Sequence, residues 1–119
     1  MDNLRREVTD KKIERLLKVF KALRLQKREM SAQELATLFY IASHNNCHKQ
    51  ALEEDLNFST ASGSRNTDKL SKHHRLPNIP GLDLIIKEVN AEELPRRQQL
   101  KLSKKGEDLM TQIKQILYE

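Results

Sequence analysis

Apolar residues recur at helical spacing in five stretches of this chain and alternate with polar residues in two others. The helical spacing predicts helices over about 3–26, 32–43, 48–55, 60–71 and 104–118. The alternation predicts strands over 82–89 and 98–102, separated by a polar turn. No repeats and no long linker interrupt the pattern, so we expect one domain over 1–119, mainly α with a small β-hairpin.

The first predicted helix, 3–26, has an apolar stripe set among many lysines and arginines. The stripe consists of Ile13, Leu16, Leu17, Phe20 and Leu23, with Leu4 and Val8 extending it upstream. A basic amphipathic helix could lie on a membrane or bind a partner, but a stripe of this kind is more typical of a docking face. We expect it to dock against the domain or against a second copy of the chain.

Polar residues mark the ends of helix 32–43. Ser31 and Glu34 form a capping box, in which each side chain accepts from the backbone N–H of the other residue. The run His44-Asn45-Asn46 ends the helix, because asparagine tolerates the left-handed conformation found at helix ends.

Two short helices joined by a tight turn follow. Helix 48–55 is followed by the turn Leu56-Asn57-Phe58, and Ser59 is a good N-cap for helix 60–71. Two short helices with a tight turn between them predict a helix-turn-helix arrangement.

The two sides of helix 60–71 differ in chemistry. Gly63, Thr67 and Leu70 form a small apolar side, so the helix must lie close to whatever it contacts. The other side combines short hydrogen-bonding groups with cations: Ser62, Arg65, Asn66, Lys69 and Lys72. This mixture suits base edges and phosphates, although a solvated surface helix is the ordinary alternative.

The turn between the two strands is cationic. It spans 90–97 and carries Pro95, Arg96 and Arg97. A hairpin with such a tip, placed directly after a helix-turn-helix, predicts a wing, and Ser103 then caps the last helix.

Composition narrows the possible partners. The 119 residues include 22 Lys+Arg and 17 Asp+Glu, for a net charge of +5. A small basic domain favours polyanions such as nucleic acid. The single cysteine excludes an internal disulfide, and no apolar run approaches the roughly 20 residues needed to cross a bilayer. We therefore expect a protein that works in the cytoplasm and makes no contact with a membrane.

The order of these elements resembles the winged-helix fold, and specifically the MarR family of bacterial transcription regulators. Four segments are similar to that family's second helix, its recognition helix, the approach to its wing and the start of the helix after the wing: 33–42, 58–70, 81–86 and 102–106. The resemblance covers about 31–117. It implies a winged helix-turn-helix core at 31–102, flanked by helices 3–26 and 103–119 that are candidates for dimerisation.

The resemblance also implies which residues contact DNA. The implied DNA-binding residues are Ser59, Thr60, Ser62, Ser64, Arg65, Asn66, Lys69, Lys72, Arg96 and Arg97. Arg65 is the best candidate for a two-point contact to guanine, and Asn66 for adenine. Arg96 and Arg97 would reach the minor groove or phosphates. Other cations are expected to contact the DNA backbone or remain solvated: His73, His74, Arg75, Lys101 and Lys104.

One departure from the family concerns the wing. In the family an Asp two residues before an Arg braces the hairpin, whereas Leu94 occupies that position relative to Arg96. Glu92 and Glu93 are the candidates to replace it.

Metal, redox and enzymatic chemistry have little support. His44, Cys47 and His48 form H-x-x-C-H, but one cysteine with scattered histidines lacks the spacing of a closed zinc site. A redox role for Cys47 would need a lowered pKa and exposure. There is no glycine-rich phosphate loop among the three glycines, and we expect neither a cofactor nor an enzyme.

The sequence therefore predicts a homodimeric regulator, most simply a repressor, that binds double-stranded DNA. The main alternative is a winged-helix adaptor, possibly phage-encoded, that binds a host protein through its basic face. A replication or partition protein with the same fold is a third alternative.

Overall fold

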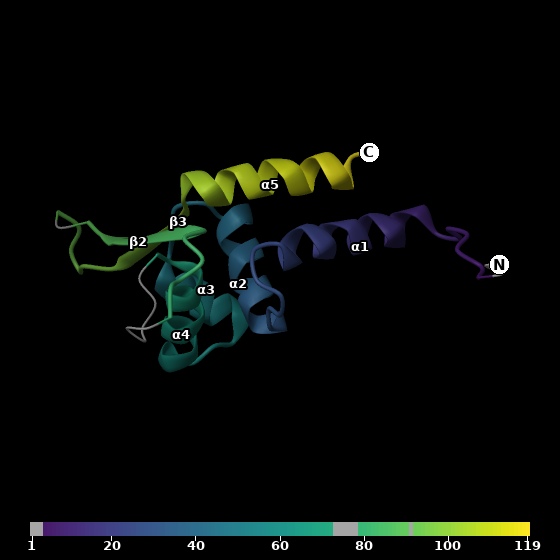
Figure 1. Cartoon of the computed structure of the whole chain (residues 1–119). Coiled ribbons are helices and arrows are strands. Elements are labelled where there is room, and N and C mark those ends of the chain that lie inside the picture. Colours follow the sequence, from purple (N-terminus) through teal and green to yellow (C-terminus); the bar gives the residue numbers. More distant parts are fainter. Residues whose placement is uncertain (1–3, 73–78, 91) are drawn as a thin grey trace.

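The computed structural model describes residues 4–72, 79–90 and 92–119. In these residues the elements follow the predicted order, with one addition (Figure 1). They are α1 (Lys11–Arg24), α2 (Ala32–Ser43), β1 (Cys47–His48), α3 (Lys49–Leu56), α4 (Thr60–Leu70), β2 (Ile85–Val89), β3 (Gln98–Leu102) and α5 (Lys104–Leu117). No helix in the described part of the chain is long and apolar enough to span a membrane.

Serine hydroxyls start three of the helices, as predicted. Ser31, Ser59 and Ser103 each accept a backbone N–H three residues ahead, at 3.1, 3.1 and 3.0 Å. These bonds satisfy donors that a helix start leaves without a partner. The other half of the predicted capping box is wrong, because the Glu34 carboxylate turns away from Ser31 and pairs with Lys27 at 2.9 Å.

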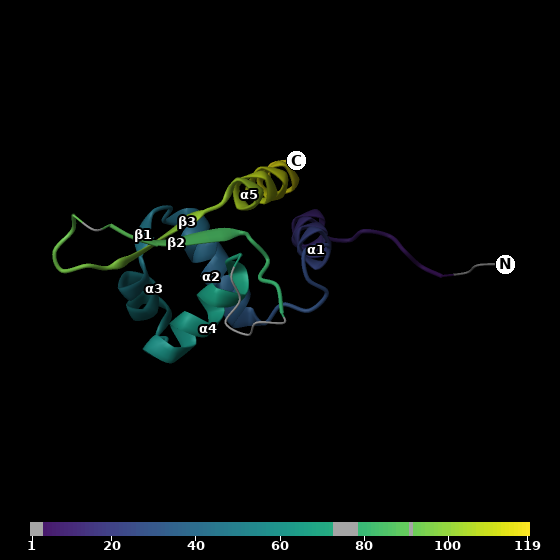
Figure 2. The same ribbon diagram turned by 60° about the vertical axis from the view of Figure 1, so that its left-hand side comes forward.

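Helix α1 is shorter than the predicted 3–26. Asp10 is its N-cap, and the Asp10 carboxylate accepts from the backbone N–H groups of Lys12 and Ile13 at 3.0 and 3.1 Å. The backbone at Asp10 is extended, so the helix begins after it, and 4–10 is an exposed arm leading away from the body (Figure 2). Leu4 and Val8 therefore do not extend the helical stripe.

The sheet has three antiparallel strands in the order β1-β3-β2. The hairpin β2–β3 was predicted, whereas β1 was not: it is two residues long and pairs Cys47 with Leu100. Strand β2 begins at Ile85 rather than at residue 82. It projects with β3 beyond α3 and α4 as a long ribbon (Figure 1).

The segment before β2 is bonded to the end of α4. The N–H groups of Leu82, Asp83 and Leu84 donate to the carbonyls of Lys69, Ser71 and Leu70, at 3.1, 3.3 and 2.8 Å. These bonds are the reason why the ladder with β3 starts later than the apolar pattern suggested. Two points of the chain that lie on either side of 73–78 are thereby held together.

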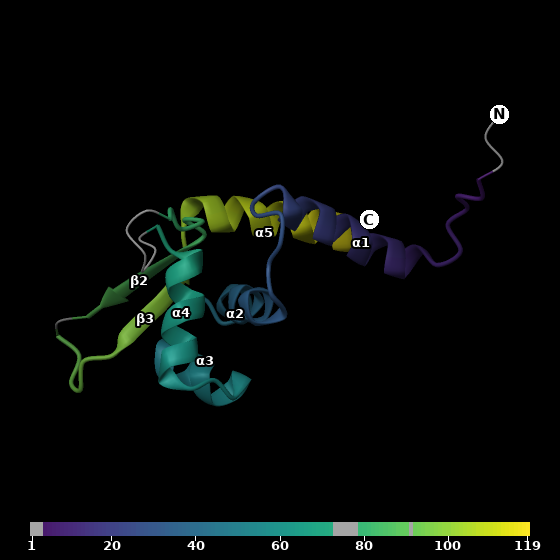
Figure 3. The same cartoon turned by 60° about the horizontal axis from the view of Figure 1, so that its bottom comes forward.

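The hydrophobic core lies between the sheet and the helices. It is built from Val19, Leu23, Leu38, Ile41, Leu52, Leu70, Leu84, Ile85, Leu100, Leu102, Leu109, Met110 and Ile113. Helices α1 and α5 lie side by side at one end of an elongated molecule of 65 × 32 × 27 Å (Figures 1 and 3).

Most of the α1 stripe remains on the surface. Ile13, Leu16, Leu17 and Phe20 are 46–60% exposed, and of the predicted stripe only Leu23 is buried. Val19 and Ala22 provide the remaining buried contacts of this helix. The rest of the described chain therefore leaves most of the stripe uncovered.

Helix α5 starts in close contact with the segment before β2. The Leu84 carbonyl accepts from the N–H of Ser103 at 3.0 Å. A Cβ added to Gly106 would lie 2.0 Å from the same carbonyl oxygen. Only a residue without a side chain allows this approach.

Candidate nucleic-acid interface

Helices α3 and α4 are joined by a tight turn at Asn57. Its φ of 57° and ψ of 40° place it in the left-handed region, which asparagine tolerates better than most residues. The N–H of Phe58 donates to the Glu53 carbonyl at 2.9 Å, and the Phe58 ring is partly buried against the core. This is the turn predicted at 56–58.

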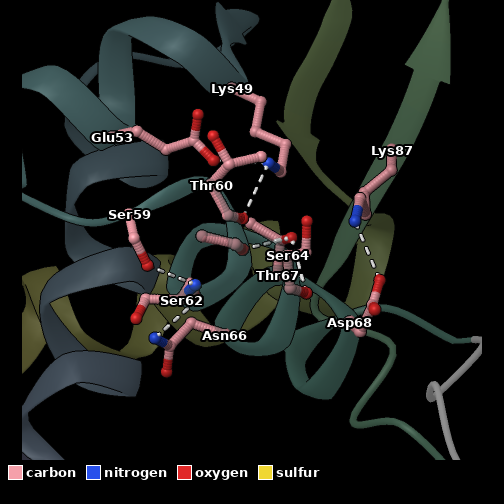
Figure 4. A network of polar contacts seen from close by, with 11 residues as sticks. Lys49, Glu53, Ser59, Thr60, Ser62, Ser64, Asn66, Thr67, Asp68 and Lys87 are labelled. Atoms are coloured by element: carbon pink, nitrogen blue, oxygen red, sulfur yellow. Dashed lines mark hydrogen bonds and ion pairs between the residues drawn. The ribbon is translucent and has the colours of Figure 1, made fainter.

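The two helices approach each other closely at Gly63. A Cβ there would lie 2.2, 2.7 and 2.9 Å from Oε2, Cγ and Cδ of Glu53. The Glu53 carboxylate pairs with Lys49, whose side chain is only 9% exposed, and Lys49 also donates to the Thr60 carbonyl at 3.5 Å (Figure 4). A buried ion pair therefore occupies the space that the glycine leaves.

The outer side of α4 is polar and cationic. Thr60, Ala61 and Arg65 are exposed, and Ser62, Ser64 and Lys69 are half-buried. An Arg65 guanidinium nitrogen, Nη2, donates to the Ser62 hydroxyl at 3.0 Å, which holds the side chain over the first turns of the helix. Ala61 was not among the predicted residues, although its position four residues before Arg65 places the two on one face.

The structure corrects the placement of Asn66, which was predicted on the outer side. Asn66 is 4% exposed, and its Nδ2 donates to Oε1 of Gln33 at 3.3 Å and to the Ser62 carbonyl at 3.0 Å. The side chain lies between α2 and α4, with its amide turned into that interface (Figure 4). It therefore does not present its amide to the exterior.

Lys69 is also directed partly towards α2. Its Nζ lies 3.8 Å from Oε1 of Glu34, and its side chain is 38% exposed. Lys72 is exposed and lies just past the end of the helix. Ser59 is exposed at the other end, with its hydroxyl engaged as the N-cap.

A pairing between α4 and β2 was missed by the sequence analysis. Asp68 accepts from Nζ of Lys87 at 2.8 Å, and both side chains are largely buried (Figure 4). The alternation in β2 gave a signal, because it placed Lys87 on the same side of the strand as Ile85. The pair attaches α4 to the β2–β3 hairpin.

The hairpin tip carries Arg96 and Arg97, both exposed. Neither has an ion-pair partner among the described residues. Behind the tip, the Glu93 carboxylate contacts Nε2 of His48 at 2.9 Å and accepts from Nε2 of Gln99 at 3.2 Å. Glu93 thus braces the tip, which was one of the two replacements expected for Leu94.

Two other predicted cations have carboxylate partners. Lys101 pairs with Glu88 at 3.1 Å and Lys104 with Asp108 at 2.7 Å. The hydrogen bond and charge of Asp108 raise the pKa of Lys104. His73, His74 and Arg75 lie outside the described residues.

Cys47 lies in β1, between His44 and His48 in the sequence. No cluster of three metal-ligating side chains occurs among the described residues. Cys47 lies half-buried in β1, and burial raises the pKa of its thiol, which disfavours the reactive thiolate. The Tyr40 hydroxyl donates to Asp55 at 2.6 Å, and this bond is the main cause that raises the pKa of Tyr40 to about 12.

No protein-family model matches the sequence, and no curated protein matches it. Solved structures do share its architecture. Rv1404 from Mycobacterium tuberculosis superposes with a TM-score of 0.63 at 17% identity, over 98% of this chain and 79% of that one. MarR gives 0.57 at 17% identity, over 87% and 74%. The fold is a MarR-like winged helix.

A third structure agrees. The PcaV transcriptional regulator from Streptomyces coelicolor, solved with its natural ligand, gives a TM-score of 0.54 at 13% identity, over 98% of this chain and 82% of that one. The MarR-like winged helix confirms the predicted fold class, with α3 and α4 as the helix-turn-helix and β2–β3 as the wing. It also confirms the resemblance that the sequence motifs indicated.

Proposed function

We propose that this chain is a transcription regulator that binds double-stranded DNA as a homodimer. The observation that carries the proposal is the outer side of α4, where Ala61 and Arg65 are exposed and Ser64 is half-buried, beside a wing with two exposed arginines. The MarR-like fold and the net charge of +5 support the same reading. A dimer bound over a promoter would act as a repressor by excluding RNA polymerase.

Base reading is assigned to the first half of α4. Arg65 offers two parallel donors that match O6 and N7 of guanine in the major groove, and the Ala61 methyl suits the methyl group of thymine. Ser62 and Ser64 are short enough to bond either a base edge or a phosphate. Asn66 is not assigned to base reading, because its amide is hydrogen-bonded to Gln33 and to the Ser62 carbonyl between α2 and α4.

Backbone contacts are assigned to the residues around this centre. Ser59, Thr60, Lys69 and Lys72 surround the outer side of α4, where phosphates would lie. Arg96 and Arg97 would enter the minor groove, whose negative potential attracts arginine where the groove is narrow.

The dimer is assigned to α1 and α5, and DNA binding to the core at 31–102. The exposed stripe of α1 has the composition of an interface rather than of a solvated surface. Leu117 at the end of α5 and the C-cap residue Tyr118 are 39% and 83% exposed. A twofold dimer would set two α4 helices about 34–36 Å apart, one turn of DNA, and would favour an inverted repeat.

Selection from random duplexes at two salt concentrations tests the DNA proposal. We expect an enriched palindrome whose affinity falls steeply with salt. Replacing Arg65 with alanine removes a two-point base contact worth about 1–3 kcal/mol, so the affinity for the selected duplex should fall roughly 5- to 150-fold. Arg28→Ala is the matched control, since Arg28 is an exposed arginine between α1 and α2 that is not among the assigned DNA contacts. Weak binding without enrichment would reject the regulator and favour the protein-binding adaptor.

The dimer has its own test. Leu17→Glu introduces a charge into the exposed stripe, and we expect a monomer by analytical ultracentrifugation with loss of the preference for palindromic duplexes. Arg15→Glu, a change of charge on the same helix outside the stripe, is the control. An unchanged sedimentation coefficient for Leu17→Glu would rule out α1 as the interface.

A further inference from the structure

The first turn of α2 holds α4 through polar side chains. Oε1 of Gln33 lies 3.3 Å from Nδ2 of Asn66, and the same nitrogen donates to the Ser62 carbonyl at 3.0 Å. Asn66 is 4% exposed, so its amide depends on protein partners rather than on solvent. The Asn66 amide thus bonds the Gln33 side chain of α2 and, in the same place, the backbone of its own helix.

The next residue of α2 makes the second contact. The Glu34 side chain is only 3% exposed, and its carboxylate oxygens lie 2.9 and 3.1 Å from Nζ of Lys27 in the α1–α2 connection. Lys69 of α4 approaches the same carboxylate to 3.8 Å. A carboxylate this deeply buried requires compensating charge, and the two lysines supply it.

We propose that Gln33 and Glu34 are specificity-determining positioning residues, which fix the rotation of α4 about its own axis. The proposal rests on the DNA-binding function above. Gln33, Glu34, Asn66 and Lys69 together form what we name the α2–α4 latch. Neither Gln33 nor Glu34 needs to touch DNA to act in this way.

The spacing of residues along α4 separates the side that contacts α2 from the outer side. Asn66 and Lys69 are three residues apart and share one side of the helix, while Ala61 and Arg65 are four apart and share the outer side. A rotation of α4 about its axis by the angle between successive residues, about 100°, would exchange these two sides. The latch, together with the Asp68–Lys87 pair on another side of α4, therefore determines which side chains reach the major groove.

The apolar contacts of α4 alone are a weaker constraint on rotation. Its inward side consists of Gly63, Thr67 and Leu70, of which only Leu70 is a large apolar residue. Apart from the close approach of Gly63 to Glu53, these contacts are few, whereas a hydrogen bond loses strength steeply when its geometry changes. Directional contacts are thus what this small interface uses to define a single orientation.

Glu34 has a second effect on binding. While its carboxylate holds Lys69, the lysine charge is partly neutralised and drawn towards α2. Sequence-independent affinity comes from cations that neutralise phosphates. Glu34 therefore limits the sequence-independent share of binding and raises the ratio between selected and scrambled duplexes.

The test measures dissociation constants for a duplex selected by the wild type and for a scrambled duplex of the same composition. Gln33→Ala removes the acceptor for the Asn66 amide. We expect the dissociation constant of the scrambled duplex, divided by that of the selected duplex, to fall about tenfold, mostly because the selected duplex binds more weakly. Gln33→Glu keeps an acceptor for Asn66 and should retain the wild-type ratio. Gln112→Ala, an exposed glutamine on α5, is the matched control.

Glu34→Gln tests the charge. It keeps the shape of the side chain but releases Lys69, so the scrambled duplex should bind more tightly, with a salt slope steeper by about one phosphate contact. Glu107→Gln removes the same charge from the first turn of α5 and should change both duplexes alike. Circular dichroism and thermal unfolding establish that each variant folds, and if Glu34→Gln does not, the Gln33 variants decide.

The outcomes distinguish failure of the latch from failure of the proposed DNA-binding function. A ratio unchanged within twofold in Gln33→Ala overturns the latch while leaving the DNA-binding function intact. The same loss in Gln33→Ala and Gln33→Glu would also overturn it, because the acceptor would then not matter. A wild type that does not discriminate between duplexes overturns the proposed function, and the latch with it.

Discussion

Replacing Gly63 with alanine has two effects on the stability of the protein, and they have opposite signs. Alanine is favoured over glycine inside a helix by about 1 kcal/mol, so the change alone should stabilise α4. The new Cβ, however, would lie 2.2–2.9 Å from three atoms of Glu53. One of them is Cγ, so bending the carboxylate aside is not enough and Glu53 must adopt another rotamer.

The second effect is the larger one. Moving Glu53 leaves the ammonium group of Lys49, 9% exposed, with only the Thr60 carbonyl as a partner. Loss of one member of a buried ion pair costs about 3–5 kcal/mol, and the lower end applies because that carbonyl remains. The expected net loss is about 2 kcal/mol, which lowers the melting temperature by roughly 8 °C for a domain of this size.

The assay is thermal unfolding at one fixed protein concentration, in two backgrounds. In the wild type, Gly63→Ala should destabilise. In a Lys49→Met, Glu53→Ala background the clash and the ion pair are both absent, so Gly63→Ala should raise the melting temperature by about 4 °C. A stabilising effect in the wild type, or the same sign in both backgrounds, would refute the reasoning.

Two further predictions concern the rest of the fold. Gly106→Ala places a Cβ 2.0 Å from the backbone oxygen of Leu84, which cannot turn aside. Overpacking of this kind lowers the free energy of unfolding by about 1–3 kcal/mol or more, which thermal unfolding measures. An unchanged melting temperature would contradict the close approach. The pKa of Tyr40 is raised to about 12 by its hydrogen bond to Asp55, so the stabilisation that this bond provides should be complete below pH about 10 and disappear as the pH rises towards 12. In a Tyr118→Phe variant, where Tyr40 alone titrates by absorbance, Asp55→Asn should lower that pKa; an unchanged titration would show that Asp55 is not the cause.

Features encoded within a few residues could be predicted from the sequence. The N-caps at Ser59 and Ser103 need only the next turn of helix, and strand β3 at 98–102 follows from its own alternation. The turn at Asn57 was equally local. Each depends on short-range geometry, which one chain segment carries by itself.

Features that depend on distant partners could not be predicted. Asn66 looked like an outward polar residue until Gln33, thirty-three positions earlier, proved to be its partner. Strand β1 exists only because β3 lies beside it, and two residues have no periodicity to detect. The N-terminal error has another cause: the apolar stripe continued past Asp10, but the carboxylate cap there ended the helix.

The bonds that join the segment before β2 to the end of α4 have a consequence for how the molecule can change. Three backbone hydrogen bonds join Leu82, Asp83 and Leu84 to the end of α4, so α4 and the β2–β3 hairpin are held together directly and not only through the chain that connects them. The entropy of closing a loop grows only slowly with its length. The end of α4 and the start of β2 therefore stay together even when the chain that connects them changes in length.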